Sequence, residues 1–340
     1  MRVLLVRLAA LLIFPCAVQA QERIELAPAS DWVMNYDEDS CALQRQFGEP
    51  GRELFLEMRQ FGPFGDLQLM VASPDLGRRS GEYEVAIEPI DVEPQKIERF
   101  DINLSDDYEG KLFSYSFDRF DEPGSVWADY IDATPALTSE QKELLRRGVA
   151  LDFDSAAYAR LMRNEEYYTT FRRTLNAFHY TEIFRTYRDA QERAVTGIVL
   201  KRAFRQEVFV RTGALHAPMQ AMRTCIDELM SHWGIDVQAH RTLSREVEPV
   251  DQRQWGREVA EHYPYAMLAQ GMQGYLRTRL DISVAGEVTG CHLQSKMNNE
   301  AFERVACDNL TRHARFNPAL DAQGQAIASY YQMSVIYAIQ

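Results

Sequence analysis

The sequence predicts an α+β fold in which strand-like segments come first and helical segments follow. Between residues 32 and 129, short apolar runs alternate with polar residues and with Gly, Pro and Asp, which is typical of antiparallel strands. From residue 138 onward, apolar residues recur at the three- and four-residue steps of amphipathic helices. We therefore expect a signal peptide at 1–20, an acidic β-rich region at 21–135, an α+β region at 136–250 and a small α+β domain at 255–340.

The first twenty residues are typical of a secretory signal peptide. Arg2 and Arg7 precede a short apolar stretch, and Val18-Gln19-Ala20 places small residues where signal peptidase requires them. The stretch is shorter than the roughly 20 apolar residues that span a bilayer. Cys16 follows Phe14-Pro15, which is unsuited to lipidation. We expect cleavage after Ala20 and, because no later stretch is long and apolar enough to span a membrane, a soluble periplasmic protein.

The charge distribution argues against two classes of partner. The whole chain has a formal net charge of -13. Between Asp31 and Asp132 there are 24 acidic and 9 basic residues, so the excess of negative charge is concentrated in this N-terminal segment. An acidic surface repels phosphates and anionic headgroups, so we expect neither nucleic acid nor a lipid surface as a partner.

Four cysteines remain after the signal peptide. An even number in an exported chain indicates disulfides, although four cysteines allow three pairings. Spacing favours Cys291 with Cys307, which closes a loop of about 15 residues worth roughly 3 kcal/mol. This choice leaves Cys41 with Cys225 as a long-range link.

Strands are predicted first, and helices follow them. Tyr83, Val85 and Ile87 alternate with glutamates, residues 54–58 form a denser apolar run, and residues 112–117 resemble them. A helix is predicted to begin at Thr138 or Ser139 and to stop at Gly148, with further helix within 154–176.

The second half of the 136–250 region combines a strand pattern with a long helix. Residues 198–210 return to strand character. A helix from Ala217 carries an apolar stripe and ends at Gly234, and residues 245–251 have the composition of a linker. The stripe comprises Met222, Cys225, Ile226, Leu229 and Trp233.

The last eighty residues present an ordered set of features. Tyr263-Pro264 precedes two glycines, a strand at 276–284, a Gly turn and a second strand that ends near Leu293. A helix with Phe302, Val305, Ala306 and Leu310 follows, and Asn298 or Asn299 is placed to cap it. Arg315-Phe316-Asn317-Pro318-Ala319 ends the helix, and a Gly turn leads to a last alternating strand at 330–339.

This order resembles the TonB C-terminal domain family over roughly residues 260–340. The resemblance implies a sheet of about three strands with helices on one face. It also implies a protein-binding role in a Gram-negative envelope, in which the last strand pairs with an extended segment of an outer-membrane receptor. On this reading the partner-binding residues are Tyr331, Met333, Val335 and Tyr337. For any one tyrosine of that strand, Tyr330 included, a plain structural role is the alternative and is somewhat favoured.

The chain also departs from an energy-transducing TonB. It has a cleavable signal in place of a membrane-anchored helix, and it has no Pro-rich spacer, so we expect it to be unable to transmit force. A disulfide between Cys291 and Cys307 would pin helix to sheet, which suits a rigid adaptor or scaffold.

Chemical motifs are weak throughout, and we assign no catalytic residue, metal site or cofactor. Residues 208–213 have the outline of an aspartic-protease turn, but Arg211 occupies the position of the essential acid. No two histidines have zinc-helix spacing. The acidic runs Asp37-Glu38-Asp39 and Asp106-Asp107-Glu109 are favoured as solvated charge over calcium ligands.

Two functional hypotheses follow from these patterns. The first is a periplasmic binding or scaffold protein whose C-terminal module recognises an envelope protein, with a segment of an outer-membrane receptor as one candidate. The second is an envelope enzyme, for example a hydrolase, with its site in residues 136–250 and the C-terminal module as a targeting device. The sequence leaves open whether the chain is an enzyme and favours the first hypothesis. A pocket containing a carboxyl or histidine of shifted pKa would favour the second hypothesis.

Overall fold

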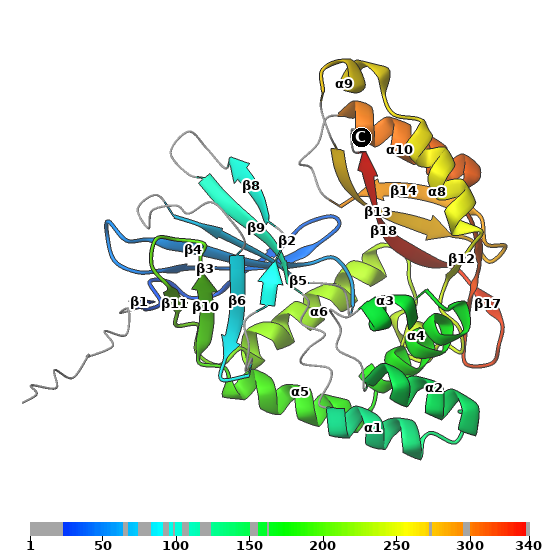
Figure 1. Cartoon of the computed structure of the whole chain (residues 1–340), viewed down its shortest axis with the longest axis horizontal. Helices are drawn as coiled ribbons and strands as arrows, with labels where there is room; N and C mark the ends of the chain where they lie inside the picture. Colours follow the sequence, from blue (N-terminus) through cyan, green and yellow to red (C-terminus); the bar gives the residue numbers. More distant parts are fainter. Residues whose placement is uncertain are drawn as a thin grey trace, which may run out of the picture.

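The computed structural model describes residues 23–63, 67–73, 83–90, 95–97, 99–103, 109–115, 124–149, 156–161, 163–271, 274–294 and 300–337. The expected signal peptide at 1–20 therefore lies outside the described residues, as do Asp106, Asp107 and the two candidate capping asparagines. The fold is α+β, as the sequence predicts. Figure 1 shows two sheets on one side, a group of helices below, and the C-terminal module on the other side.

A six-stranded antiparallel sheet dominates the N-terminal part. One face of this sheet is buried, so on three of its central strands the residues that point into the core alternate with residues that point away from it. In spatial order the strands are β2 (Val33–Tyr36), β3 (Cys41–Phe47), β4 (Leu54–Gln60), β5 (Leu67–Ala72), β9 (Glu109–Tyr115) and β8 (Arg99–Asn103).

A five-stranded sheet shares the same hydrophobic core. Tyr83, Val85 and Ile87 are fully buried, which confirms the alternation seen in the sequence. The spatial order is β1 (Ile24–Leu26), β11 (Val208–Val210), β10 (Gly197–Lys201), β6 (Tyr83–Glu88) and β7 (Gln95–Ile97). Only β1 and β11 pair in parallel. Because β10 and β11 come from the segment 136–250 and the other three strands from 21–135, one core joins the two segments.

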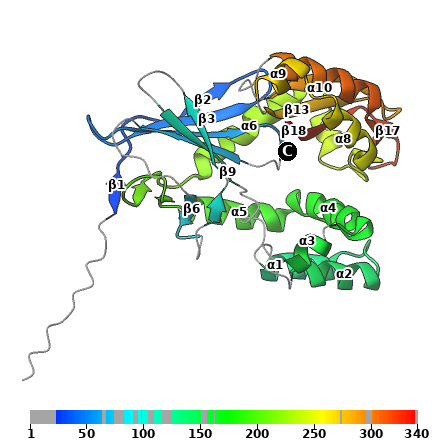
Figure 2. The same cartoon turned by 45° about the horizontal axis from the view of Figure 1, so that its top comes forward.

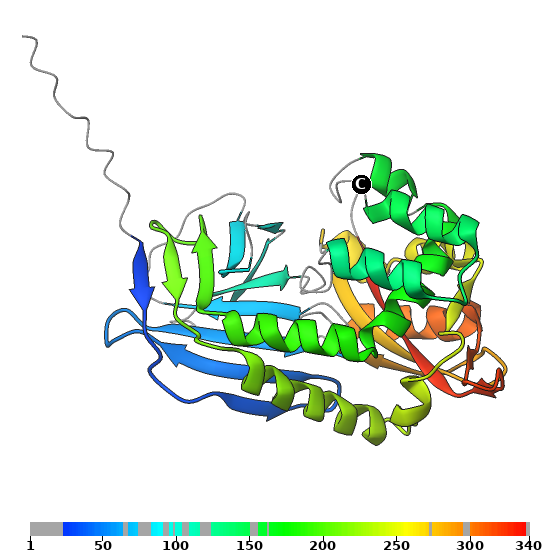
Figure 3. The ribbon, with the colours of Figure 1, turned by 90° about the horizontal axis from the view of Figure 1, so that it is seen from below.

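The long helix α6 (His216–His232) packs on β3 and completes this core (Figure 3). Its buried stripe contains Met222, Cys225, Ile226 and Leu229, at the predicted helical spacing. The helix ends at His232 with Trp233 as its C-cap, and Gly234 follows with a φ of +78°, a left-handed conformation that glycine adopts without strain.

Five further helices gather around an aromatic core, on one side of the molecule in Figure 2. Thr138 and Gln141 exchange backbone-to-side-chain hydrogen bonds of 3.0 and 3.2 Å, a capping box that starts the second helix where the sequence predicts it. The first helix begins at Gly124, within the segment that the sequence predicts to be strand-like. This segment is helical because Trp127 and Ile131, four residues apart, then both face the aromatic core. The helices are α1 (Gly124–Ala133), α2 (Ser139–Val149), α3 (Ala156–Leu161), α4 (Glu165–His179) and α5 (Glu182–Ala194).

The C-terminal module has its own core, between one face of a three-stranded sheet and α10. Part of the segment 245–251, whose composition is that of a linker, instead forms β12, which pairs with β15 and so belongs to the module. Its helices are α8 (Gln252–Glu261), α9 (Tyr265–Ala269) and α10 (Glu300–His313), and short α7 (Val237–His240) precedes it. Its strands are β12 (Glu248–Val250), β13 (Gly274–Ile282), β14 (Val288–Leu293), β15 (Arg315–Asn317), β16 (Ala319–Leu320), β17 (Ala326–Ile327) and β18 (Ser329–Tyr337).

Within the described residues, no helix is both long and apolar enough to cross a membrane.

Candidate functional site

The last strand, β18, lies at one edge of the module's sheet. The strand order is β14-β13-β18, and β18 pairs with β13 antiparallel along its whole length, from Ser329 opposite Ile282 to Tyr337 opposite Gly274. Among the strands that the structure describes, β13 is its only partner. An edge strand presents a row of backbone N–H and C=O groups along which an extended chain can pair.

The four predicted partner-binding residues share one side of β18, the side covered by α10. Val335 and Tyr337 are buried in the module's core, and Tyr331 and Met333 pack partly buried against it. The Tyr337 ring stacks on Phe302 at 5.2 Å, and burial raises the pKa of its phenol to about 12. These side chains hold the module together, so any partner contact along this segment falls to the backbone edge of the strand.

The other face of the same sheet is docked on the N-terminal part of the protein. The guanidinium of Arg279, on β13, lies 3.1 Å from the carboxylate of Asp39 and also pairs with Asp281. The same guanidinium lies over the ring of Trp233, with its Cζ atom 4.1 Å from the ring centroid. Only 5% of the Arg279 side chain is exposed. This cation therefore joins the β2–β3 turn, the end of α6 and the module in one contact.

Polar and aromatic groups extend the docking surface along β18. The amide of Gln332 donates to the carbonyl of Phe61 at 2.6 Å, and that of Gln294 donates to the same oxygen at 3.3 Å. Tyr330 meets Trp233 edge to face at 5.5 Å. Tyr330 and Gln332 belong to the set of β18 residues that alternates with the core-facing ones, so the two sides of this strand serve two different interfaces.

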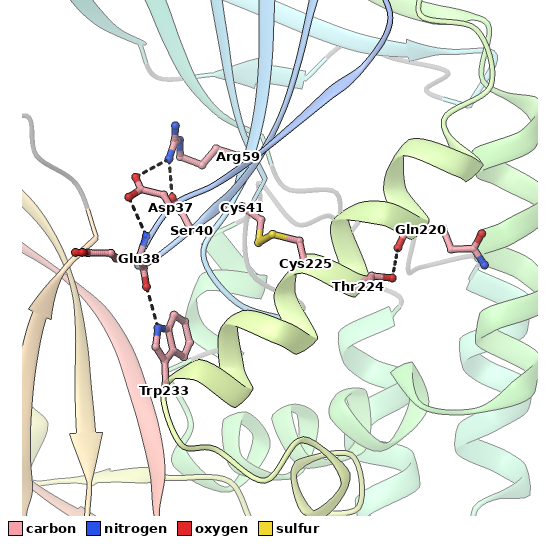
Figure 4. The surroundings of a disulfide bond; sticks show 9 residues. All are labelled: Asp37, Glu38, Ser40, Cys41, Arg59, Gln220, Thr224, Cys225 and Trp233. Carbon is pink, nitrogen blue, oxygen red and sulfur yellow. Dashed lines mark hydrogen bonds and ion pairs between the residues drawn. A yellow bond between two sulfur atoms is a disulfide. The ribbon is translucent and has the colours of Figure 1, made fainter.

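Two disulfides brace these interfaces, in the pairing that spacing favours. Cys41 at the start of β3 is bonded to Cys225 in the middle of α6. Figure 4 shows this bond beside the turn that holds Asp37, Glu38 and Ser40, with the Trp233 indole N–H donating to the Glu38 carbonyl at 3.1 Å. Inside the module, Cys291 of β14 is bonded to Cys307 of α10. The first disulfide thus joins β3 to α6, and the β2–β3 turn and the end of α6 both contact Arg279.

A cavity of about 110 Å³ opens where α4, the segment after α6, and β18 meet. Burial raises the pKa of the Glu246 carboxyl, which the Arg172 guanidinium at 3.6 Å and His179 partly offset. Burial also lowers the pKa of His240. The lining consists of Pro63, Arg172, Leu175, His179, Tyr180, Met230, His240, Leu243, Glu246 and Tyr330. It therefore combines apolar surface with a cation, a carboxyl and two phenols, and apart from Pro63 and Tyr330 it comes from residues 172–246.

A cluster of Asp189, Glu192 and His216 has metal-ligand atoms within 4.8 Å of one another. Three arginines already contact this cluster. Arg223 donates to Glu192 at 2.6 and 3.1 Å, and Arg188 donates to Asp189 at 3.0 Å. A guanidinium nitrogen of Arg193 lies 2.9 Å from the His216 ring nitrogen. The cluster is an ion-pair network, since three cations disfavour a fourth.

The two acidic runs proposed as calcium alternatives have different outcomes. Asp39 faces Arg279, and Asp37 lies 3.5 Å from Arg59, so the first run forms ion pairs with arginines. The second run is centred on residues that the structure does not describe.

Sequence reasoning did not identify Arg279, Gln294 or Gln332. It considered Tyr330 only as a residue of the last strand and not as part of a cavity. One signal was available on β13, where Arg277 and Arg279 alternate with Leu276, Thr278 and Leu280. That pattern predicts a half-buried strand but does not say that the polar face is covered too.

Comparison with known families agrees with this architecture in the C-terminal module. Residues 259–339 match the family described as Gram-negative bacterial TonB protein C-terminal. Searches of curated proteins and of solved structures each found no match to this chain. The strand–turn–strand–helix–strand order of β13, β14, α10 and β18 falls within the matched residues. The chain therefore carries a TonB C-terminal domain, a domain of envelope proteins, at residues 259–339.

Proposed function

We propose that this chain is a periplasmic binding or scaffold protein whose TonB-type module receives an extended segment of an envelope protein along the outer edge of β18. The observation that carries the proposal is that both side-chain faces of β18 are already occupied by this protein. One side of β18 supports the module's core and the other side is docked on Trp233 and Phe61, so the backbone edge is the part left to a partner. Pairing along an edge needs no free side-chain face.

The docked state also supports a scaffold over a force transducer. Arg279, Gln294 and Gln332 tie the module to the N-terminal part, and Cys291–Cys307 ties α10 to the sheet. A module that deforms under load would have to break these contacts. A segment of an outer-membrane receptor remains one candidate partner. The two disulfides fit the oxidising compartment that the expected signal peptide implies.

In-cell photo-crosslinking at the two opposite edges of the sheet tests this proposal. Ser334 is exposed on β18, and Thr289 is exposed on β14 at the far edge. We expect a photoreactive residue at Ser334 to capture one defined envelope protein, identified by mass spectrometry, and the same residue at Thr289 to capture none. Equal capture from both edges, or crosslinks from Ser334 confined to this chain, would contradict the proposal.

An envelope enzyme with its site in residues 136–250 is the second candidate function. The cavity lined by Glu246 and His240 is the observation that favours it, because both groups have shifted pKa values. Its described lining contains no Ser, Thr or Cys to act as nucleophile, and burial raises the pKa of both tyrosines. Hydrolysis of a substrate that is lost in Glu246→Gln would support this candidate.

A further inference from the structure

The cavity beside β18 is large enough for an organic molecule. A single water occupies about 10–15 Å³ on this measure, and an apolar cavity of about 150 Å³ binds benzene. A volume of about 110 Å³ lies between these cases and suits a molecule of five or six heavy atoms. The cavity is partly open to solvent, and the side chain of Arg172 on its lining is 55% exposed. A small ligand therefore has both room and an entrance.

The two charges on the lining form an ion pair with each other. The Arg172 Nη2 and Glu246 Oε2 atoms are 3.6 Å apart, so the cavity presents a cation and a carboxyl side by side. Glu246 keeps 34% of its side chain exposed although its carboxyl lies deep among other groups, and burial raises its pKa. An ammonium group beside this carboxyl would offset the cost of its burial.

The rest of the lining is preorganised. His240 engages both of its ring nitrogens, with the Asp236 carbonyl at 2.8 Å and the Ser329 hydroxyl at 2.7 Å, so it is a fixed wall. Met230, Leu175 and Leu243 provide apolar surface on the same lining. Fixed walls reduce the entropy that is lost when a ligand binds.

We propose that this cavity binds a small zwitterion of the amino-acid class, with its carboxylate on Arg172, its ammonium group on Glu246, and a short side chain against the leucines and Met230. In an amino acid one carbon atom separates the ammonium nitrogen from the carboxylate carbon, so its two charges match a cation and a carboxyl that lie side by side. The Tyr330 ring, at the start of the proposed partner strand, forms part of the same lining. The proposal does not rest on partner binding at β18, because it concerns the isolated protein.

Isothermal titration of the purified full chain with glycine and with L-alanine tests this assignment. Acetate and methylammonium, which carry one charge each, are the matched ligands. We expect saturable binding of the amino acids that is at least about tenfold tighter than binding of either single-charge ligand, since hydrogen bonds to charged groups are each worth about that factor. Equal binding of acetate, or no saturable binding of either amino acid, would overturn the proposal.

Variants locate the site. Glu246→Gln and Arg172→Gln should each weaken binding about tenfold or more. Glu228→Gln and Arg173→Gln make the same chemical changes at exposed positions outside the lining, and should leave the affinity within about twofold. Urea unfolding of each variant separates loss of binding from loss of fold. If the control variants weaken binding as much as the cavity variants, the assignment is wrong.

Discussion

His240 shows how a single residue can couple the docked module to pH. It is the buried last residue of α7, and its two ring nitrogens contact the Asp236 carbonyl and the Ser329 hydroxyl at the start of β18. Burial lowers the pKa of the imidazole from its usual 6.5, and the carbonyl and charge of Asp236 offset this only in part. The folded protein therefore holds His240 neutral at a pH where the unfolded chain would begin to protonate it.

The sign of the pH dependence follows from this shift. Below pH 6.5 the unfolded state binds more protons at this histidine than the folded state, so the free energy of unfolding falls as the pH is lowered from 6.5 toward the folded pKa. We expect His240→Asn to be less stable than wild type at pH 7.5 and to lose less additional stability between pH 7 and pH 5. Urea unfolding at a series of pH values measures both.

Glu246 provides the internal control. Burial raises the pKa of its carboxyl from 4.5, so its contribution has the opposite sign and weakens the fold as the pH rises through the folded pKa. This contribution of Glu246 is the same in wild type and in His240→Asn. The difference between the pH profiles of the two proteins therefore reports the titration of the histidine alone. Parallel pH profiles for the two proteins would show that His240 is not the titrating group.

At the scale of elements, the disulfide between Cys291 and Cys307 joins α10 to β14 across the module's core. The helix also packs there through Phe302, Ala306 and Leu310, so the bond supplements an existing interface. Because the closed loop spans a sequence separation of 16, it restricts the unfolded chain only locally.

Removing that bond should loosen the module and leave the large sheets unchanged. In Cys291→Ala/Cys307→Ala we expect faster amide hydrogen exchange in α10 and β14 and a loss of about 3 kcal/mol in the free energy of unfolding. Exchange in β3 and β4 should remain at the wild-type rate, which makes these strands the control within one experiment. Uniformly faster exchange across both parts would contradict a local role.

At the scale of the whole molecule, the docking contact around Arg279 connects two hydrophobic cores. The cation lies between Asp39, Asp281 and the Trp233 ring, and the Cys41–Cys225 bond holds the elements that carry two of these partners. Removing this buried cation is costly, because it takes the charged partner away from Asp39, whose side chain is only 21% exposed.

Arg279→Met should therefore separate the module from the N-terminal part without unfolding it. We expect the free energy of unfolding to fall by about 3 kcal/mol and protease cleavage to appear between the two cores. Arg253→Met, at an exposed position of α8, is the matched control and should change stability by less than about 0.5 kcal/mol. Unchanged stability and proteolysis in Arg279→Met would show that this docking contact contributes little.

Local periodicity accounts for the elements that were predicted correctly. The alternation at Tyr83 to Ile87, the stripe on α6 and the capping box at Thr138 depend on neighbours in sequence, so one sequence is enough to find them. The order of elements in the module was equally legible. The assignment of strand β12 to a linker was wrong, because three residues with a proline show no periodicity and become a strand only through β15.

What the sequence determined by itself is the α+β class, most element types, a TonB-type module at the C-terminus and the spacing that favours the observed cysteine pairs. Only the tertiary structure decided that β10 and β11 complete a sheet begun by β1 and β6, and that Arg279 is buried. It also decided that the four predicted partner-binding residues Tyr331, Met333, Val335 and Tyr337 face the module's own core. The physical reason is that periodicity tells which face of an element is apolar, whereas burial of the polar face depends on groups hundreds of residues away. Asp39 and Arg279 are 240 residues apart, and neither one predicts the other.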